Sequence, residues 1–118
     1  MAAIQIYVSR KNFDQQKAER FFKERRIPLQ FVDLKKHKMG LRELQLFARA
    51  AGGARNLVDR ENVNALSHPV AHTDNEAVIL EYLMEKPEFL RTPILRDGQR
   101  VVIGEDAAAW QKLAEMQK

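Results

Sequence analysis

The sequence contains no cysteine, which excludes disulfide bonds, thiolate metal ligands and a nucleophilic thiol among its own side chains. Helix breakers are also scarce, with four prolines and five glycines in 118 residues. No apolar run approaches the roughly 20 residues that span a bilayer, and the N-terminus lacks the basic-then-apolar order of a signal peptide. Because 45% of the residues are hydrophobic, we expect one compact cytoplasmic domain without a membrane segment.

Charge is distributed unevenly along the chain. Residues 1–60 hold 14 Lys and Arg against 6 Asp and Glu, whereas residues 61–118 hold 6 against 10. A basic half can bind nucleic acid, an acidic protein surface or a small anion. The competing interpretation is a solvated surface, because both signs interleave within the predicted helices. Nucleic acid is the least favoured partner, since the aromatic residues fall at buried positions of the pattern and no recognised motif is present.

The first third of the sequence predicts a strand, a helix and a second strand. Residues 3–8 carry the Ile, Tyr and Val of a buried strand, and residues 13–26 have the apolar spacing of an amphipathic helix. Pro28 ends that helix because its ring disfavours helical geometry at the preceding residue. Residues 29–34 form the next expected strand, parallel to the first because a helix connects the two. We expect Phe21 and Phe31 to be in the core.

The rest of the sequence predicts further helices and a hairpin. In chain order we expect a helix at about 41–51, short helical pieces at 56–60 and 63–66, a loop at 67–72, a helix at about 75–86, strands at 92–95 and 99–103, and a helix at about 105–116. Thr73 or Asp74 can cap the helix at 75–86. Asp97-Gly98 between two apolar runs predicts that the last two strands are antiparallel. Periodicity alone therefore gives an α/β fold with a parallel pair and a hairpin.

The segment from Tyr7 to Ala18 reads Tyr-Val-Ser-Arg-Lys-Asn-Phe-Asp-Gln-Gln-Lys-Ala. It resembles the opening of the arsenate reductase/Spx-like family, usually written Tyr-Gly-Thr-x-x-Cys-x-x-Cys/Ser-x-Lys-Ala. Asn12 stands at the first cysteine position and Gln15 at the second. Neither amide can form the thiolate that thiol chemistry needs. The resemblance therefore implies a member of the family that lacks the redox cysteines.

Four further segments resemble the family pattern in the same order along the chain. They are residues 31–36, 56–60, 85–94 and 101–104. One departure concerns the arginine that directly precedes the family's proline, which is replaced here by Thr92. Arg91 lies one position earlier and would face the opposite side of an extended strand.

The resemblance implies a thioredoxin-like fold, in which helices flank a mixed four-stranded sheet and residues about 41–73 form a helical insertion within a single domain. Pro93 resembles the cis-proline that opens the third strand of such folds. The backbone of Thr92 before it would then pair with an extended peptide or with glutathione. The alternative is that this turn only positions the strand.

The resemblance also implies an anion- or ligand-binding site at the start of the first helix. Its candidate residues are Arg10, Lys11, Asn12, Arg60, Arg91, Thr92 and Pro93. A helix N-terminus favours anions through its unpaired N–H groups. The competing interpretation is that Asn12 only caps the helix and that the arginines are surface charges. No catalytic residue is expected, nor any metal site, because Pro69 interrupts the helical spacing of His68 and His72.

Two functions follow from the resemblance. The first is a non-enzymatic binding or regulatory protein without a cofactor, which in an Spx-like role would dock on RNA polymerase through a surface that includes Gly52 and Arg60. The second is an enzyme, a glutathione-dependent reductase or transferase whose thiol belongs to a cosubstrate that the protein only positions. The missing cysteines favour the first. A small anion is a ligand compatible with either.

Overall fold

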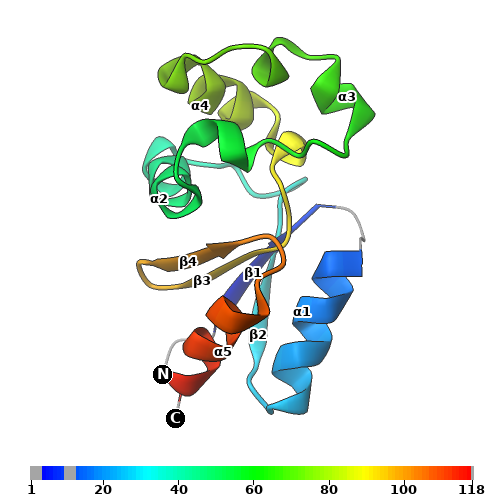
Figure 1. Cartoon of the computed structure of the whole chain (residues 1–118), viewed down its shortest axis with the longest axis vertical. Helices are drawn as coiled ribbons and strands as arrows, with labels where there is room; N and C mark the ends of the chain where they lie inside the picture. The colour runs from blue at the N-terminus through cyan, green and yellow to red at the C-terminus, as the bar shows by residue number, and fades with distance from the viewer. Residues whose placement is uncertain (1–3, 10–12, 118) are drawn as a thin grey trace. The chain divides into compact units, whose positions relative to one another are not determined.

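The structure is a computed structural model that describes residues 4–9 and 13–117. The chain divides into two compact units (Figure 1). The first unit joins Met1–Asp33 to Thr92–Lys118, and the second is the continuous segment Leu34–Arg91. The insertion predicted at about 41–73 falls inside the second unit. That the chain forms a single domain stays a prediction.

The first unit contains a mixed four-stranded sheet. Its strands are β1 (Ile4–Val8), β2 (Leu29–Asp33), β3 (Ile94–Asp97) and β4 (Arg100–Ile103), in the spatial order β2-β1-β3-β4. Strand β1 pairs parallel with β2 and antiparallel with β3, and β3 pairs antiparallel with β4. The predicted parallel pair, hairpin and fold class are therefore confirmed.

Helix α1 (Phe13–Glu24) makes the crossover between the parallel strands, and it ends two residues before the predicted position. Arg26 adopts the left-handed conformation, with φ of 57°. Its N–H donates to Lys23 O at 3.0 Å, and the N–H of Ile27 reaches back to Phe22 O at 2.9 Å. This pair of bonds is the Schellman arrangement that closes helix C-termini, so Arg26 rather than Pro28 ends the helix.

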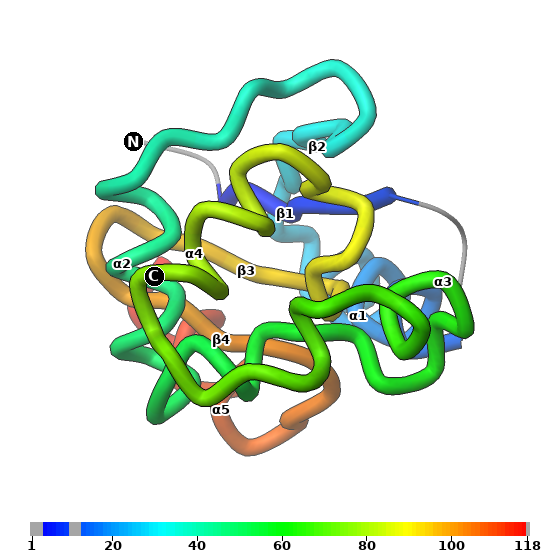
Figure 2. The backbone as a smooth tube through the Cα atoms, turned by 90° about the horizontal axis from the view of Figure 1, so that it is seen from above, coloured from blue at the N-terminus to red at the C-terminus, as the bar shows by residue number. Residues whose placement is uncertain are grey.

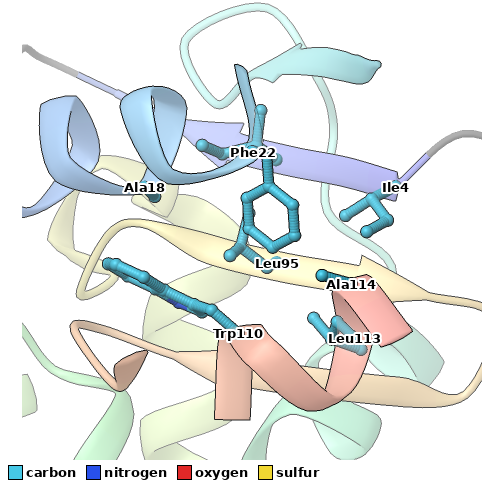
Figure 3. Close-up of a cluster of buried hydrophobic side chains, with 8 residues drawn as sticks. Ile4, Ala18, Phe22, Leu95, Trp110, Leu113 and Ala114 are labelled. Carbon is cyan, nitrogen blue, oxygen red and sulfur yellow. The ribbon is translucent and has the colours of Figure 1, made fainter. Parts of the chain in front are cut away.

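The core of the first unit lies between the sheet and two helices, α1 and α5 (Ala107–Glu115). Its buried members are Ile4, Ile6, Ala18, Phe22, Leu95, Trp110, Leu113 and Ala114. Figure 3 shows side chains of α1 and α5 gathered against Leu95 of β3. Phe21 packs against this cluster as a half-buried residue.

The expectation that Phe31 is buried is wrong. Its side chain is 53% exposed. The register pairs Phe31 with Ile6, so both point to the same face of the sheet, but β2 is an edge strand. Alternation along a strand predicts the face of a residue and not whether a helix covers it.

The second unit is helical, and Figure 2 traces its path from α2 through α3 to α4. Its elements are α2 (Leu41–Ala51), the 3-10 turn η1 (Ala54–Leu57), α3 (Val63–Leu66), the 3-10 turn η2 (Pro69–Ala71), α4 (Glu76–Glu85) and the 3-10 turn η3 (Pro87–Phe89). Its largest fully buried side chains are Phe47, Leu34, Met39, Leu44, Leu57, Ile79, Leu83 and Leu90.

Two details of the second unit differ from the prediction. The N-cap of α4 is Asn75, whose Oδ1 accepts the N–H of Val78 at 3.2 Å, and not Thr73 or Asp74. Thr73 Oγ1 instead accepts the N–H of Asn75, one step before the helix. The expected loop at 67–72 contains the 3-10 turn η2, because proline at its first position already has helical φ.

Helix α1, at 12 residues, is the longest described helix. None of the helices in residues 4–9 and 13–117 combines the length and the apolar character needed to cross a membrane.

Candidate functional site

Of the two positions at which the family pattern has cysteine, the second, residue 15, lies on α1. Arg10, Lys11 and Asn12 lie outside the described residues. Gln15 is 7% exposed in the first turn of α1, and its Nε2 donates to Glu19 Oε2 at 3.2 Å. The second cysteine position therefore holds a buried amide that is hydrogen-bonded within its own helix.

The Thr92-Pro93 peptide bond is cis, as the resemblance predicts. Both residues are buried at the start of β3, and Thr92 is 7% exposed. The carbonyl of Pro93 accepts the N–H of Gly104 at 2.8 Å, which joins this turn to the residue that follows β4. The backbone of Pro93 is thus held by the hairpin.

Arg60 and Arg91 lie on two segments of the second unit that run side by side. An antiparallel bridge pairs Val58 with Leu90, and the N–H of Arg91 donates to Leu57 O at 2.6 Å. Arg60 lies in the turn that follows the bridge, two residues after Val58, and Arg91 directly follows Leu90. The structure therefore brings together the segments that carry these residues.

The guanidinium of Arg60 is directed at carbonyls of its own unit. Nη1 donates to Ala71 O at 3.3 Å, and Nη2 donates to Arg55 O at 3.4 Å. These two bonds connect Arg60 to η2 through Ala71 and to η1 through Arg55. Gly52 likewise has a structural role, because its left-handed φ of 82° closes α2 with N–H bonds to Ala48 O and Arg49 O.

The candidate anion site is thus divided. Thr92 and Pro93 belong to the first unit, Arg60 and Arg91 to the second, and residues 10–12 are not described. A site built from all of them stays a prediction.

Sequence reasoning missed the most buried polar side chain of the second unit. Asn62 is 4% exposed, and its Oδ1 accepts the N–H groups of Asn64 at 2.9 Å and Ala65 at 3.4 Å. Its Nδ2 donates to Glu88 O at 3.5 Å. The signal was present, because asparagine directly before an apolar helical run is a preferred N-cap.

A small pocket also escaped prediction. It has a volume of about 200 Å³ and lies in the first unit, at the C-terminal ends of α1 and α5. The side chains that line it are Arg25, Arg26, Ile27, Gln111, Ala114, Glu115 and Gln117. No local pattern could have shown it, because its two walls are more than 80 residues apart in the chain.

The closest ion pair of the described residues joins Lys17 of α1 to Glu105 before α5, with Nζ 2.6 Å from Oε2. The hydrogen bond from Lys17 lowers the pKa of Glu105, and the bond to Glu105 raises the pKa of Lys17. Both side chains are well exposed. This pair is therefore a surface link between helices rather than a perturbed catalytic group.

Histidines and carboxylates are dispersed over the described parts of the chain. His37 Nε2 lies 3.1 Å from Glu43 Oε1 in the second unit. Within residues 4–9 and 13–117, no three His, Asp or Glu side chains group in a way that could hold a metal ion.

Comparison with known families identifies the relationship. The family model described as the ArsC family matches residues 15–113. The chain belongs to the ArsC family. It is a member without cysteine, with Gln15 at the start of the matched region. No curated protein sequence matches significantly.

Solved structures of related proteins share the fold of this ArsC-family chain. It superimposes on the YffB protein with a TM-score of 0.77 at 20% identity, covering 93% of this chain and 97% of that one. An arsenate reductase (ArsC) related protein from Brucella melitensis superimposes with a TM-score of 0.69 at 19% identity, covering 94% of this chain and 93% of that one. An ArsC family related protein from Bacteroides fragilis superimposes with a TM-score of 0.80 at 16% identity, covering 95% of this chain and 98% of that one. At these identities the likeness shows the thioredoxin-like fold alone.

Proposed function

We propose that this ArsC-family chain is a binding or regulatory protein that performs no thiol redox chemistry with a side chain of its own. The observation that carries the proposal is the absence of cysteine from all 118 residues. A thiol mechanism needs a thiolate as nucleophile, and the amides of Asn12 and Gln15 cannot supply one. The bond from Gln15 to Glu19 supports a structural role for that position.

The contacts of the histidines support the same proposal. A serine such as Ser9 would need an adjacent base to act as a nucleophile. His68 Nδ1 accepts the N–H of Val70 at 3.0 Å, and His72 Nε2 donates to Leu66 O at 2.6 Å. His37 is paired with Glu43. In these contacts each histidine pairs with a backbone group or a carboxylate within residues 34–91, and not with a serine or threonine hydroxyl that it could activate.

A protein partner is the ligand class that the second unit favours. Val63 is 71% exposed and Leu66 is 39% exposed, and their spacing of three places them on one face of α3. In the proposal these two neighbouring apolar side chains are the start of the contact surface that a protein partner covers. Arg60 precedes this helix and is exposed. In the Spx-like form of the proposal, RNA polymerase is the partner and this face of α3 is the contact.

The absence of thiol chemistry is tested by an arsenate reduction assay with glutathione, coupled to NADPH oxidation through glutathione reductase. We expect no turnover above the protein-free rate. The matched variant Asn12→Cys should gain a thiol that reacts with iodoacetamide below neutral pH, because a helix N-terminus lowers a thiol pKa. Turnover by the unaltered protein, or its saturable thermal stabilisation by glutathione, would instead support the cosubstrate-thiol enzyme.

The partner is tested separately by surface plasmon resonance with purified RNA polymerase of the source organism. Val63→Asp and Leu66→Asp should each weaken binding, whereas the control Asn64→Asp, which alters a polar residue of the same helix, should not. If the unaltered protein does not bind, polymerase is rejected as the partner, and the proposal that the chain lacks thiol chemistry is unaffected.

A further inference from the structure

The pocket in the first unit shares no residue with the candidate anion site. The three residues that follow α1 form one wall, and the C-terminal half of α5 together with Gln117 forms the other. Its volume of about 200 Å³ is below the roughly 300–1,000 Å³ of pockets for drug-sized ligands. A ligand that fits must therefore be small.

Arg25 is held in place at this pocket. Its Nη1 donates to Phe21 O at 3.0 Å, and its Nε donates to Gln111 Oε1 at 3.3 Å. The guanidinium carbon lies 3.5 Å from the centroid of the Phe21 ring. Because these contacts come from both helices, the positive charge is positioned before any ligand arrives, which reduces the entropic cost of binding.

Arg26 occupies a backbone position that glycine would fill at lower cost. Its φ of 57° is the left-handed conformation at the C-terminus of α1, where a Cβ is disfavoured. Its side chain lines the pocket, and among the described residues it makes no hydrogen bond or ion pair that would account for an arginine here. The residue therefore adds a second guanidinium, without a partner among the described residues, to the lining of the pocket that Arg25 also lines.

The pocket also contains negative charge. Glu115 lines it and accepts a hydrogen bond from Gln111 Nε2 at 3.3 Å. The C-terminal ends of α1 and α5 add partial negative charge, because the helix macrodipole places its negative end at the last carbonyl groups. An anion alone would be repelled by Glu115 and these carbonyls, and a cation alone would be repelled by the arginines. A ligand with both charges matches the whole lining.

We propose that this pocket binds a free α-amino acid with an apolar side chain. The carboxylate pairs with Arg26 and Arg25, since guanidinium groups match carboxylate geometry. The ammonium pairs with Glu115. The side chain lies against Ile27, which is half-buried, and Ala114, which is buried. This inference does not depend on the proposed function.

The test is an NMR titration of the 15N-labelled full chain. The probes are leucine, N-acetyl-leucine, leucinamide and inorganic phosphate, which separate the two charges. Leucine should shift the amide signals of Ile27 and Glu115 saturably. The two analogues, each lacking one charge, should bind about tenfold or more weakly. The proposal is overturned if leucine causes no saturable shift, or if N-acetyl-leucine or phosphate binds as tightly as leucine.

Two variants link the binding to the named side chains. Arg26→Gly should abolish leucine binding while the fold is retained, because glycine suits the left-handed position. The control Arg20→Gln alters an exposed arginine of the same helix outside the pocket and should bind leucine normally. Glu115→Gln should remove the preference for leucine over N-acetyl-leucine. Unchanged leucine binding by Arg26→Gly would contradict the assignment.

Discussion

The guanidinium carbon of Arg25 lies 3.5 Å from the centroid of the Phe21 ring, one turn earlier on α1. The same ring lies 5.7 Å from Trp110 of α5 and 5.2 Å from Phe22, measured between centroids. Phe21 thus separates a surface cation from the buried aromatic side chains of the first unit. One side chain both contributes to the core and positions a pocket residue.

Phe21→Leu should lower the free energy of unfolding by about 1–2 kcal/mol, since a cation–π contact and an aromatic pair are each worth about 0.5–1.5 kcal/mol. Urea denaturation followed by tryptophan fluorescence measures the change. The control Phe13→Leu, at a position 81% exposed on the same helix, should stay within about 0.5 kcal/mol of the unaltered protein. Equal losses at the two positions would contradict the contact.

Phe22→Ala should cost about 3–5 kcal/mol, because a fully buried phenylalanine loses its transfer energy and leaves a cavity. Phe31→Ala is the matched substitution at a position that is 53% exposed, and it should cost much less. Thermal and urea unfolding of both variants gives the comparison. A larger loss for Phe31→Ala would mean that the edge of the sheet is covered in solution.

Asn62→Ala should destabilise the protein by about 1–2 kcal/mol, because the N-cap of α3 is lost and the Glu88 carbonyl loses a donor. The control Asn64→Ala removes the same amide from an exposed position of that helix and should have little effect. Differential scanning calorimetry measures the melting temperatures of the two variants. Indistinguishable melting temperatures would show that the cap contributes nothing.

Arg26→Gly should stabilise the protein, by about 1 kcal/mol, because glycine adopts a positive φ without a steric cost. The same substitution at Arg20, within α1, should destabilise it by about 0.5–1 kcal/mol, because glycine is unfavourable inside a helix. Chemical denaturation measures both values. The changes in unfolding free energy should therefore have opposite signs in the two variants. A loss of stability in Arg26→Gly would contradict the assignment of steric cost to the left-handed position.

The Lys17–Glu105 pair should couple the two helices only over a window of pH. The pKa of Glu105 is lowered, so its contribution is present above the ordinary glutamate value and is lost as pH falls through the lowered value. The pKa of Lys17 is raised, so its contribution is present below the ordinary lysine value and is lost as pH rises through the raised one.

A double-mutant cycle with Lys17→Met and Glu105→Gln measures this coupling. A small favourable coupling is expected at neutral pH, and it should disappear as the pH falls through the lowered pKa of Glu105. It should also weaken in high salt, because both side chains are exposed. A coupling that persists in acid would show that the interaction is not ionic.

The order of the elements followed from local signals. Apolar spacing over residues 13–26, the Asp97-Gly98 turn and the glycines at 52 and 53 each act on their nearest neighbours in the chain. Backbone geometry is set at that range, so the strands, most of the helices and the hairpin were predictable. The cap of α4 was missed by one residue because Thr73, Asp74 and Asn75 can all accept the required bond, and sequence does not choose among them.

The candidate site depended on longer-range information. Sequence placed Asn12 and Gln15 where thiols would stand, and it located the proline whose peptide bond is cis. It could not show that Arg60 is hydrogen-bonded to Ala71 O and Arg55 O, because those contacts depend on how η1 and η2 pack. It could not show the pocket beside Arg26 for the same reason.

By itself, the sequence determined which chemistry this protein lacks and which elements it forms. An absent thiol is a property of composition, and helix or strand preference is a property of neighbouring residues. Only the tertiary structure decided that Phe31 is exposed while Phe22 is buried, and that Arg25 and Arg26 line a pocket with Glu115. Burial and charge pairing depend on which distant segments meet, and that is fixed only when the chain has packed.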